Sequence, residues 1–359
     1  MPRSGRHDRV RGRLLAWFRR EKRRLPWRGT RDPYRIWVSE VMLQQTTVPA
    51  VLGRYERFLE RFPDLDRLAR ASREQVLAAW SGLGYYARAR HLHAAARELA
   101  RAGRWPRTPE RLRALPGFGE YMAAAVADLA FGARAPAVDA NVGRILARLD
   151  AIGGPKPGAD AKAVRAFAAG LLARGRPADV IAALMDLGQL VCTPRDPDCA
   201  ACPLASLCLA RRTGTAHRYP RRAAKPRTRR VFMAAACAVR GRSALLTRSA
   251  QSRLAGLWQF PAAEGATRER ALEGLRLALA PLGLAVESAA EPASARHTIM
   301  NRLLDIRVYR ARPIEGPASR IGNRSSVRWF TPGRLRTAAI PTLTRRIATA
   351  AGFLPADGT

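Results

Sequence analysis

The chain has 359 residues, of which 47% are hydrophobic, and this length and composition suffice for two globular domains with separate cores. Its 64 Lys and Arg against 28 Asp and Glu give a net charge of +36, which predicts a polyanionic partner, first of all nucleic acid. Nearly all of this charge is arginine, so a genome rich in arginine codons can account for part of it. No stretch is apolar enough to span a membrane, and the N-terminal segment lacks the apolar block of a signal peptide, so we expect a cytoplasmic protein.

Apolar residues recur at three- and four-residue spacing from Asp8 to about Ala210, which predicts an all-α domain over residues 1–210. Residues 211–230 are rich in arginine and lack this period, so they are expected to form a basic linker. Residues 231–359 mix strand and helix patterns, which predicts an α+β domain. Its strands are expected at Val231–Val239 and Leu303–Tyr309, and its helices at Arg268–Ala280 and Leu343–Ala351.

An early helix is expected to begin at Asp32-Pro33, because Asp is a capping residue and Pro suits the first helical turn. The residues that follow leave almost no polar side, so this helix is expected to be buried. Glu40 shares a face with Ile36 and Trp37. A carboxyl in that place loses hydration, which raises its pKa and suits it to act as a general acid near neutral pH. The alternative is a glutamate at the rim of the core whose head reaches water.

Two further helices are predicted on either side of the tight turn Leu115-Pro116-Gly117-Phe118-Gly119. Thr108-Pro109 has the pattern of a capped helix start, and the second helix begins at Glu120. Gly117 and Gly119 permit positive φ and close backbone approach, and the second helix opens with free N–H groups. The turn can therefore bind a phosphate without reading base sequence, although an ordinary helix–helix connection is the alternative.

Asp139 precedes a helix predicted over Ala140–Leu149 and is a candidate N-cap. Amide donors and the helix dipole keep such a carboxylate ionised. An ionised carboxylate can also stabilise a developing oxocarbenium ion, so capping and catalysis are compatible roles for this residue.

Four of the five cysteines lie in a C-x6-C-x2-C-x5-C run, at Cys192, Cys199, Cys202 and Cys208. Disulfides are not expected, because these cysteines are clustered in one part of a long chain that shows no export signal. A zinc site more often joins two close cysteine pairs across a longer loop, whereas here a single C-x2-C is flanked by isolated cysteines. The spacing favours an iron–sulfur cluster, and structural zinc is the alternative.

Taken in order, the turn L-P-G-x-G, the segment Val138-Asp139-Ala140-Asn141-Val142 and the cysteine run resemble the helix-hairpin-helix DNA glycosylases that carry an iron–sulfur cluster. Within that superfamily, Ser39-Glu40-Val41-Met42-Leu43-Gln44-Gln45-Thr46 and Gly82-Leu83-Gly84-Tyr85-Tyr86-Ala87-Arg88-Ala89-Arg90 look like the adenine DNA glycosylases of the MutY type. The likeness is close over residues 14–210 and looser afterwards. It implies one 4Fe-4S cluster on the four cysteines, with a structural role in a loop that holds Arg195 near phosphates.

The resemblance also implies how the chemistry is divided. Glu40 is expected to protonate N7 of an extruded adenine, while Asp139 stays charged and stabilises the sugar cation, as in retaining glycoside hydrolysis. Tyr121 stands where bifunctional relatives carry a Schiff-base lysine, so we expect a monofunctional enzyme. Tyr121 and Asn141, beside Asp139, are expected to support the transition state.

Extrusion of a base leaves a gap that side chains fill from the minor groove. The resemblance assigns this role to Gln45 and Tyr85. Further expected DNA contacts are Leu115, Gly117, Gly119 and Arg88.

Arg23, Trp27 and Arg28 match positions that line the adenine pocket of relatives. Relatives usually carry Asn and then Gln or Glu just before the A-L-M-D-L-G stretch, where this chain has Ile181 and Ala182. A polar contact to the base is therefore expected to be missing.

The resemblance implies that the C-terminal domain is Nudix-like in fold and reads the base opposite the adenine. The segment 254–261 fits the G-L-W-x-F-P pattern, but no acidic box follows, so nucleotide pyrophosphate hydrolysis is not expected. The loop that usually reads H-x-F-S-H is H-T-I-M-N here, and Thr298, Met300 and Asn301 are expected to meet the opposite base. Met replaces a hydroxyl that could bind the modified base, so a preference for 8-oxoguanine over guanine is left open.

Together these features predict a monomeric adenine DNA glycosylase of base excision repair that acts on adenine opposite 8-oxoguanine or guanine in double-stranded DNA. One alternative is an endonuclease III-like glycosylase for oxidised or mismatched pyrimidines, which would carry lysine at position 121. The other is a catalytically silent DNA-binding protein that keeps the fold and the cluster. The presence of Glu40, Asp139 and Tyr121 argues against the silent protein.

Overall fold

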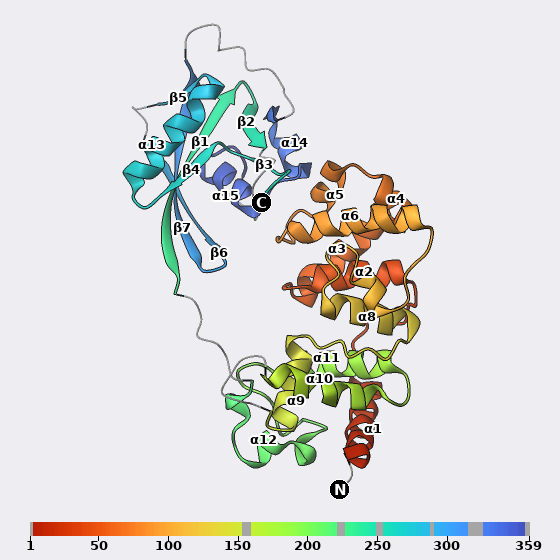
Figure 1. Ribbon diagram of the computed structural model, residues 1–359. Coiled ribbons are helices and arrows are strands. Elements are labelled where there is room, and N and C mark those ends of the chain that lie inside the picture. Colours follow the sequence, from red (N-terminus) through yellow and green to blue (C-terminus); the bar gives the residue numbers. More distant parts are fainter. Residues whose placement is uncertain are drawn as a thin grey trace. The chain divides into compact units, whose positions relative to one another are not determined.

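The structure is a computed structural model that describes residues 3–152, 159–220, 227–248, 254–287, 291–314 and 326–355 (Figure 1). The chain forms two compact units, one of Met1–Ala69 with Ala94–Ala224 and one of Arg70–His93 with Lys225–Thr359. Residues 221–226 of the expected linker lie outside the described part of the chain, and the boundaries at 210 and 231 stay a prediction.

Helices dominate the chain as far as residue 218. They are α1 (Arg3–Glu21), α2 (Pro33–Leu43), α3 (Val48–Arg61), α4 (Leu65–Arg70), α5 (Arg73–Ala79), α6 (Ala87–Ala102), α7 (Pro109–Leu112), α8 (Glu120–Phe131), α9 (Ala140–Leu149), α10 (Ala159–Leu172), α11 (Pro177–Leu190), α12 (Leu209–Arg212) and the short 3-10 turns Ala205–Leu207 and Ala216–Arg218. The helices predicted to start after Asp32, Thr108 and Asp139 begin there, because each of these side chains accepts a hydrogen bond from a backbone N–H of the first turn.

One core of the first unit lies among α1, α8, α9, α10 and α11. Leu14, Leu146, Leu171 and Leu187 are each 0% exposed within it. Three of the clustered cysteines, Cys192, Cys202 and Cys208, pack against the same core. The segment of residues 192–208 that contains the four cysteines, here called the cysteine loop, thus packs against the helices that carry the candidate site.

The predicted hairpin is formed by α7, residues 113–119 and α8. Gly117 has a φ of +79°, a conformation that glycine adopts without strain. Gly119 has an ordinary φ of −69°, so it does not use the positive φ that a glycine permits. A Cβ on Gly119 would meet no protein atom within 4 Å, so the outside of the turn is open at this point. Phe118 anchors the turn by stacking on Trp37 of α2, with ring centroids 5.4 Å apart.

In the described part of the second unit, eight strands form a sheet in which β1 and β7 pair in parallel. Its elements are β1 (Arg229–Arg240), β2 (Ser243–Arg248), β3 (Trp258–Gln259), β4 (Ala262–Gly265), α13 (Arg268–Leu279), the 3-10 turn Ala280–Leu282, β5 (Leu284–Val286), β6 (Ala293–Ile299), β7 (Arg302–Pro313), β8 (Val327–Phe330), α14 (Pro332–Thr337) and α15 (Thr342–Ala350). The two strands and two helices predicted here are confirmed within a few residues at each end.

Alternate residues of β1 face two different cores, as a strand buried on both sides requires. Ala235 and Cys237 pack in the core that includes Ile347 of α15. Ala236 packs in the core that includes Leu275 of α13. The sheet is therefore covered by α15 on one face and α13 on the other, which confirms the α+β expectation (Figure 1).

The segment Arg70–His93 folds with the C-terminal unit, which the sequence did not indicate. The Glu74 carboxylate accepts hydrogen bonds of 3.1 Å from Arg248 and from the indole N–H of Trp258, whose side chain is buried. The Tyr86 hydroxyl donates to the carbonyl oxygen of Ile340 at 2.7 Å. These contacts attach the loop of residues 80–86, here called the Tyr85 loop, to the C-terminal part of the same unit.

No helix in the part of the chain that the structure describes combines the length and the apolar character needed to cross a bilayer.

Candidate active site

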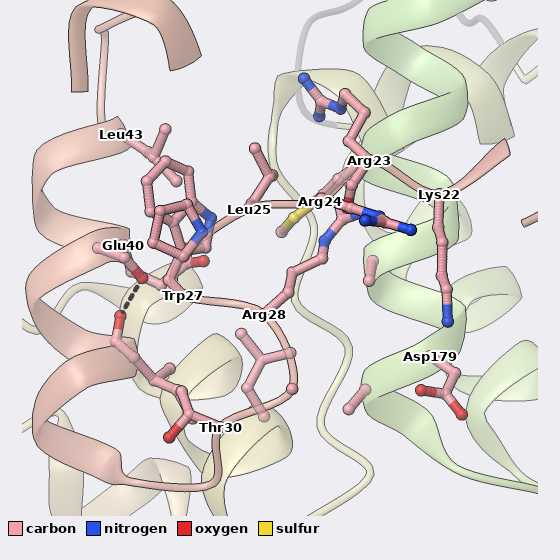
Figure 2. A pocket seen from close by; sticks show the side chains of 18 of the residues that line it. Lys22, Arg23, Arg24, Leu25, Trp27, Arg28, Thr30, Glu40, Leu43 and Asp179 are labelled. Carbon is pink, nitrogen blue, oxygen red and sulfur yellow. Dashed lines mark hydrogen bonds between the residues drawn. The ribbon is translucent and has the colours of Figure 1, made fainter. Parts of the chain in front are cut away.

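Helix α2 places Glu40 in the wall of a pocket of about 780 Å³. The Asp32 side chain accepts a hydrogen bond from the Tyr34 N–H and so starts the helix on a defined residue. Eight residues later Glu40 is only 6% exposed, because the helix around it is almost wholly apolar. Figure 2 shows its carboxyl beside the Trp27 ring at the pocket wall. The prediction of a buried acid is confirmed, and the alternative of a solvated rim glutamate is wrong.

The Glu40 carboxyl accepts a hydrogen bond of 2.7 Å from the hydroxyl of Tyr121, which lies at the start of α8. Burial raises the pKa of Glu40 to about 7, the Tyr121 hydrogen bond opposes this rise, and the charge of Asp139 adds to it. Burial, followed by the charges of Glu40 and Asp139, raises the pKa of Tyr121 well above its ordinary value. The pair can therefore hold a proton on Glu40 near neutral pH.

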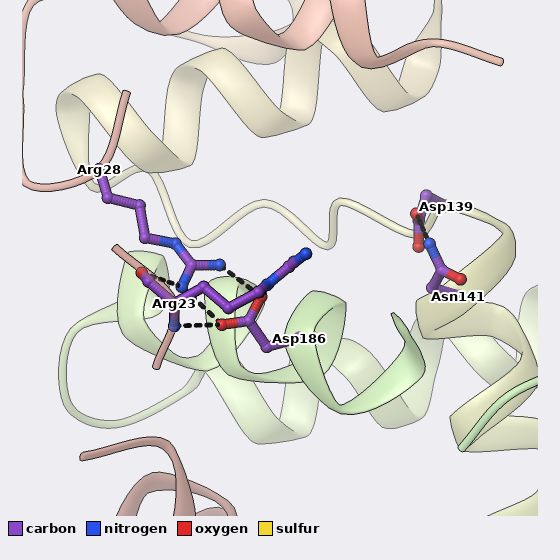
Figure 3. Close-up of polar contacts among 5 residues, drawn as sticks. All are labelled: Arg23, Arg28, Asp139, Asn141 and Asp186. Carbon is purple, nitrogen blue, oxygen red and sulfur yellow. Dashed lines mark hydrogen bonds and ion pairs between the residues drawn. The ribbon is translucent and has the colours of Figure 1, made fainter. Parts of the chain in front are cut away.

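Asp139 caps α9 and is oriented by Asn141 (Figure 3). One carboxylate oxygen accepts from the Val142 N–H at 2.7 Å, and the other accepts from the Asn141 side-chain amide at 2.9 Å. The charge of Asp139 acts on both Glu40 and Tyr121, so these three residues form one electrostatic group. The structure thus shows two hydrogen-bonded pairs, Glu40 with Tyr121 and Asp139 with Asn141, and Glu40 is the one of these four residues that lines the pocket.

Arg144, one turn after Asn141, extends this arrangement toward the cysteine loop. Its guanidinium donates to the Asn141 side-chain oxygen at 2.8 Å, to the Gly188 carbonyl at 2.7 Å and to the Cys192 carbonyl at 2.8 Å. A Cβ on Gly188 would lie 2.7 Å from the Cβ of Asn141. Gly188 is therefore required for α9 and α11 to approach closely enough to hold Asn141 in place.

Arg23, Trp27 and Arg28 all line the pocket, but the two arginines are held by a residue that was not predicted (Figure 3). The side chain of Asp186 is 0% exposed and accepts from Arg23 Nε at 2.8 Å and from Arg28 Nη2 at 2.7 Å. Burial alone would raise the pKa of Asp186, but hydrogen bonds and charges from Arg28 and Arg23 hold it below its ordinary value. Trp27 is buried and its ring meets that of Tyr55 edge-on at 5.3 Å.

Of the two residues that depart from the family pattern, Ile181 and Ala182, only Ala182 lines the pocket. Ile181 is 2% exposed and belongs to the hydrophobic core of the first unit. Ala182 lines the pocket, so a methyl group stands where relatives place an amide or a carboxyl. Gln189, which is two turns further along α11 and exposed, also lines the pocket.

Three residues expected to touch DNA have a left-handed backbone, with φ of +55° at Gln45, +46° at Tyr85 and +55° at Met300. Such a conformation is uncommon for residues other than glycine and costs of order 1 kcal/mol or more. Tyr85 is 51% exposed and Met300 is 70% exposed, although both side chains are large and apolar. Strained, exposed side chains of this kind suit a surface that meets a partner.

Arg88, another expected DNA contact, has its guanidinium directed to its own loop. It donates to the Leu83 carbonyl at 3.0 Å and lies over the Trp80 and Tyr85 rings at 5.5 and 5.4 Å. Burial lowers the pKa of Arg88 to about 10. In this structure Arg88 supports the Tyr85 loop from within.

The Cys192, Cys199, Cys202 and Cys208 thiols are free and half-buried. Burial raises the pKa of the Cys202 thiol to about 11, and the charges of Cys192, Cys208 and Cys199 contribute to the rise, so the four sulfurs lie near one another. Within the described ranges, no three His, Cys, Asp or Glu side chains are arranged to hold a single metal ion.

The expected opposite-base residues lie at the tip of the β6–β7 hairpin. Thr298 pairs with Leu303 and Ile299 with Arg302, so Met300 and Asn301 form the connection. The backbone of Asn301 is fixed to β1, because its carbonyl oxygen accepts a hydrogen bond from the Arg229 N–H at 2.8 Å. The tip therefore presents Met300 outward from a fixed backbone.

Sequence reasoning missed Asp186, Arg144, Arg148 and Gly188, although each has a position that can be interpreted. Arg144 and Arg148 are 5% and 2% exposed on α9, where they lie four residues apart on its apolar side. A charged residue inside an otherwise apolar stripe indicates a buried hydrogen-bonded group, and this signal was available. No comparable pattern indicates which arginines meet Asp186.

Two family models match the chain. Residues 38–168 match the HhH-GPD superfamily of base excision DNA repair proteins, and residues 233–350 match the NUDIX domain.

Among curated proteins, the chain is 34% identical to the human adenine DNA glycosylase over 94% of this chain and 73% of that protein. It is 45% identical to the mouse adenine DNA glycosylase over 56% of this chain and 41% of the mouse protein. It is 39% identical to the adenine DNA glycosylase of Mycobacterium tuberculosis H37Rv over 73% of this chain and 86% of that protein. A solved structure of a thermostable thymine-DNA glycosylase is 30% identical, with a TM-score of 0.54, over 58% of this chain and 98% of its own.

Proposed function

Because the chain belongs to the adenine DNA glycosylases of the HhH-GPD superfamily, we propose that its substrate is adenine mispaired with 8-oxoguanine or guanine in double-stranded DNA. Its activity is hydrolysis of the N-glycosyl bond of adenine in base excision repair. The observation that carries the proposed mechanism is the buried Glu40 carboxyl, hydrogen-bonded to Tyr121 in the wall of a pocket.

In this proposal Glu40 is the general acid. Its pKa of about 7 keeps a large fraction of the carboxyl protonated at neutral pH. Transfer of that proton to N7 of an extruded adenine makes the base a better leaving group. The pocket of about 780 Å³ has room for the base beside Trp27.

Asp139 is the proposed stabiliser of the sugar cation. Two hydrogen bonds to its carboxylate, from the Val142 N–H and the Asn141 amide, fix its direction. Glu40 then supplies a proton and Asp139 stabilises the cation on one nucleotide, as two carboxyls do in retaining glycoside hydrolysis. Water takes the place of the base.

We propose that the reaction ends with base removal, without strand cleavage. Tyr121 cannot form a Schiff base, and the pocket contains one amine, Lys22, whose side chain extends toward Asp179 in Figure 2. Borohydride trapping on an adenine mispair tests this proposal, and no covalent complex is expected. A trapped complex that disappears in Lys22→Ala would contradict it.

For DNA binding, we propose that the 113–119 turn holds a phosphate with backbone N–H groups at the start of α8, where Gly119 leaves open space. Leu115 and Gly117 flank that contact. Gln45 and Tyr85 enter the duplex when the adenine leaves it, and their exposed, left-handed positions are suited to this. Arg88 keeps the Tyr85 loop in shape.

We propose that Cys192, Cys199, Cys202 and Cys208 hold one 4Fe-4S cluster. The support is the C-x6-C-x2-C-x5-C spacing, in which isolated cysteines flank a single close pair, and the charge of the other three thiols that acts on Cys202. When bound, the cluster orders the loop between α11 and α12. The purified protein is expected to be brown, and Cys202→Ser is expected to lose both the colour and DNA binding; a colourless, active protein that contains zinc would contradict the assignment.

The second unit is the proposed reader of the opposite base, through Thr298, Met300 and Asn301. Met300 offers an apolar surface and no hydroxyl, so discrimination between 8-oxoguanine and guanine is expected to be smaller than a hydrogen bond to the modified base would give. We further propose a monomer with a glycosylase domain at 1–210, a basic linker at 211–230 and a Nudix-like domain at 231–359.

The decisive experiment uses duplexes with A:8-oxoG, A:G, G:T and A:T pairs, each incubated with the full chain and then cleaved at abasic sites with alkali. Strand breaks are expected at the two adenine mispairs, and Glu40→Gln serves as the control for contaminating enzymes. Breaks at G:T alone would support the pyrimidine alternative. No breaks at either adenine mispair would overturn the proposal.

A further inference from the structure

The guanidinium of Arg148 lies between α9 and the cysteine loop and is almost completely buried, with 2% of the residue exposed. Its donors meet Cys192 Sγ at 3.3 Å, Thr193 O at 2.7 Å, Pro194 O at 3.3 Å, Ala216 O at 2.9 Å and Tyr219 O at 3.1 Å. One side chain therefore connects three segments that are distant in the sequence: α9, the start of the cysteine loop and the segment that follows α12.

These contacts leave the positive charge of Arg148 without a carboxylate. Its neighbours are four carbonyl oxygens and one sulfur, and no Asp or Glu in the described part of the chain forms an ion pair with it. A buried charge without a counterion costs several kcal/mol, so such a residue is normally paired. The Cys192 sulfur is the one neighbour that becomes an anion, when it ligates a metal.

The neighbouring Arg144 contacts Cys192 at a different atom. Its guanidinium donates to the Cys192 carbonyl oxygen and also to Asn141 and Gly188, so it serves the Asp139 side of the site. Arg148 donates to the sulfur itself. The two arginines on one face of α9 therefore meet Cys192 at different atoms.

We propose that Arg148 is a positioning residue of the metal centre, which supplies the counter-charge for the Cys192 thiolate and fastens residues 192–194 and 216–219 to α9. The inference rests on the 4Fe-4S cluster of the proposed function. A cluster with four thiolates is anionic, and a cation at one sulfur stabilises its more negative state. Hydrogen bonds to the sulfurs and local charge are the means by which proteins adjust such clusters.

Charge and hydrogen bonding can be separated with two variants. Arg148→Met removes both and keeps most of the side-chain volume. Arg148→Lys keeps the charge but loses the planar fork, so it cannot reach five acceptors at once. Arg134→Met is the matched control, because Arg134 also donates to a backbone carbonyl, that of Leu172 at 2.6 Å, without a cysteine contact.

The measurements are iron content, the rate at which visible absorbance is lost under a chelator, and the reduction potential by voltammetry, all on the full chain. In Arg148→Met we expect cluster loss to be about 10- to 100-fold faster, as for other residues that support metal ligands, and the potential to become more negative. In Arg148→Lys we expect faster loss with a potential close to that of the unmodified chain. Arg134→Met is expected to change neither quantity.

Unchanged loss rate and potential in Arg148→Met would overturn the inference while the cluster assignment stands. If Arg148→Met does not fold, Arg148→Lys decides, since an unchanged loss rate in that variant contradicts the role of the five hydrogen bonds. A colourless unmodified protein would instead overturn the iron–sulfur assignment itself, before any variant is compared.

Discussion

Two carboxyl groups of the first unit, Glu40 on α2 and Asp186 on α11, are both almost completely hidden from water, and yet their pKa values are shifted in opposite directions. Glu40 is 6% exposed, and burial raises its pKa to about 7. Asp186 is 0% exposed, and Arg28 and Arg23 hold its pKa below the ordinary value although burial alone would raise it. Burial is common to both, so the difference comes from the partners: one neutral hydroxyl for Glu40 and two guanidinium groups for Asp186.

Two buried acids in one domain can therefore serve opposite purposes. Glu40 is left without a cation, which weakens folding at high pH but keeps a proton available. Asp186 is fully paired and keeps the backbone between α1 and α2 against α11, so that Trp27 faces the pocket. Three substitutions test this difference in four measurements.

Glu40→Gln is expected to have the largest effect, because the amide cannot transfer a proton. Loss of a general acid lowers the rate by about 10²- to 10⁴-fold. Single-turnover assays on an A:8-oxoG duplex measure it. Binding to the same duplex, measured by fluorescence anisotropy, serves as the control and should stay within a few-fold; a rate close to that of the unmodified chain would exclude Glu40 as the acid.

Asp186→Asn is expected to lower stability, because two arginines lose their common anion. Breaking a buried ion pair on one side costs about 3–5 kcal/mol, and the partial exposure of both guanidinium groups places this case at the low end. Urea unfolding at pH 7 measures the loss. The lowered pKa of Asp186 means that its contribution is present above the unfolded pKa and disappears as pH falls through the folded one. The deficit should therefore shrink in strong acid, and an equal deficit at all pH values would contradict the ion-pair account.

Glu40→Gln should have the opposite effect on stability. The folded pKa of Glu40, about 7, lies above the ordinary value of 4.5, so the stabilisation from a protonated Glu40 is present below the unfolded pKa and lost as pH rises through about 7. The variant should therefore be more stable than the unmodified chain at pH 8, by up to about 3 kcal/mol, and similar to it near pH 4. Thermal unfolding at both pH values tests this, with Glu60→Gln on the exposed end of α3 as the control. If the variant is no more stable than the unmodified chain at pH 8, burial does not destabilise the charged form of Glu40.

Tyr121→Phe is expected to have the smallest effect. The Tyr121 hydrogen bond lowers the pKa of Glu40, so its removal should raise that pKa and move the alkaline limb of the kcat/KM profile to higher pH. A single hydrogen bond of this kind contributes about 0.5–1.5 kcal/mol, so the shift should not exceed about one pH unit. A shift toward lower pH would mean that Tyr121 favours the protonated acid instead.

Much of the local structure could be predicted because it depends on neighbours in the sequence. The Asp32, Thr108 and Asp139 caps, the helix that buries Glu40, and the strands β1 and β7 follow from capping residues and apolar periodicity. Gly119 shows the limit of this reasoning, since a glycine in a tight turn permits both a positive φ and a close approach, and the backbone is extended there. A glycine can serve to leave space as well as to adopt an unusual φ.

The pairing of side chains across helices could not be predicted, because it depends on which faces meet after the chain has folded. Residue types and spacing on the sequence determined the two carboxyls, the cysteine run and the order of the elements. Only the tertiary structure decided that Tyr121 meets Glu40, that Asp186 takes two arginines and that Arg148 meets a cysteine sulfur. The physical reason is that protonation and charge compensation act over a few ångströms of space, and residues between 44 and 163 positions apart in the chain supply those neighbours.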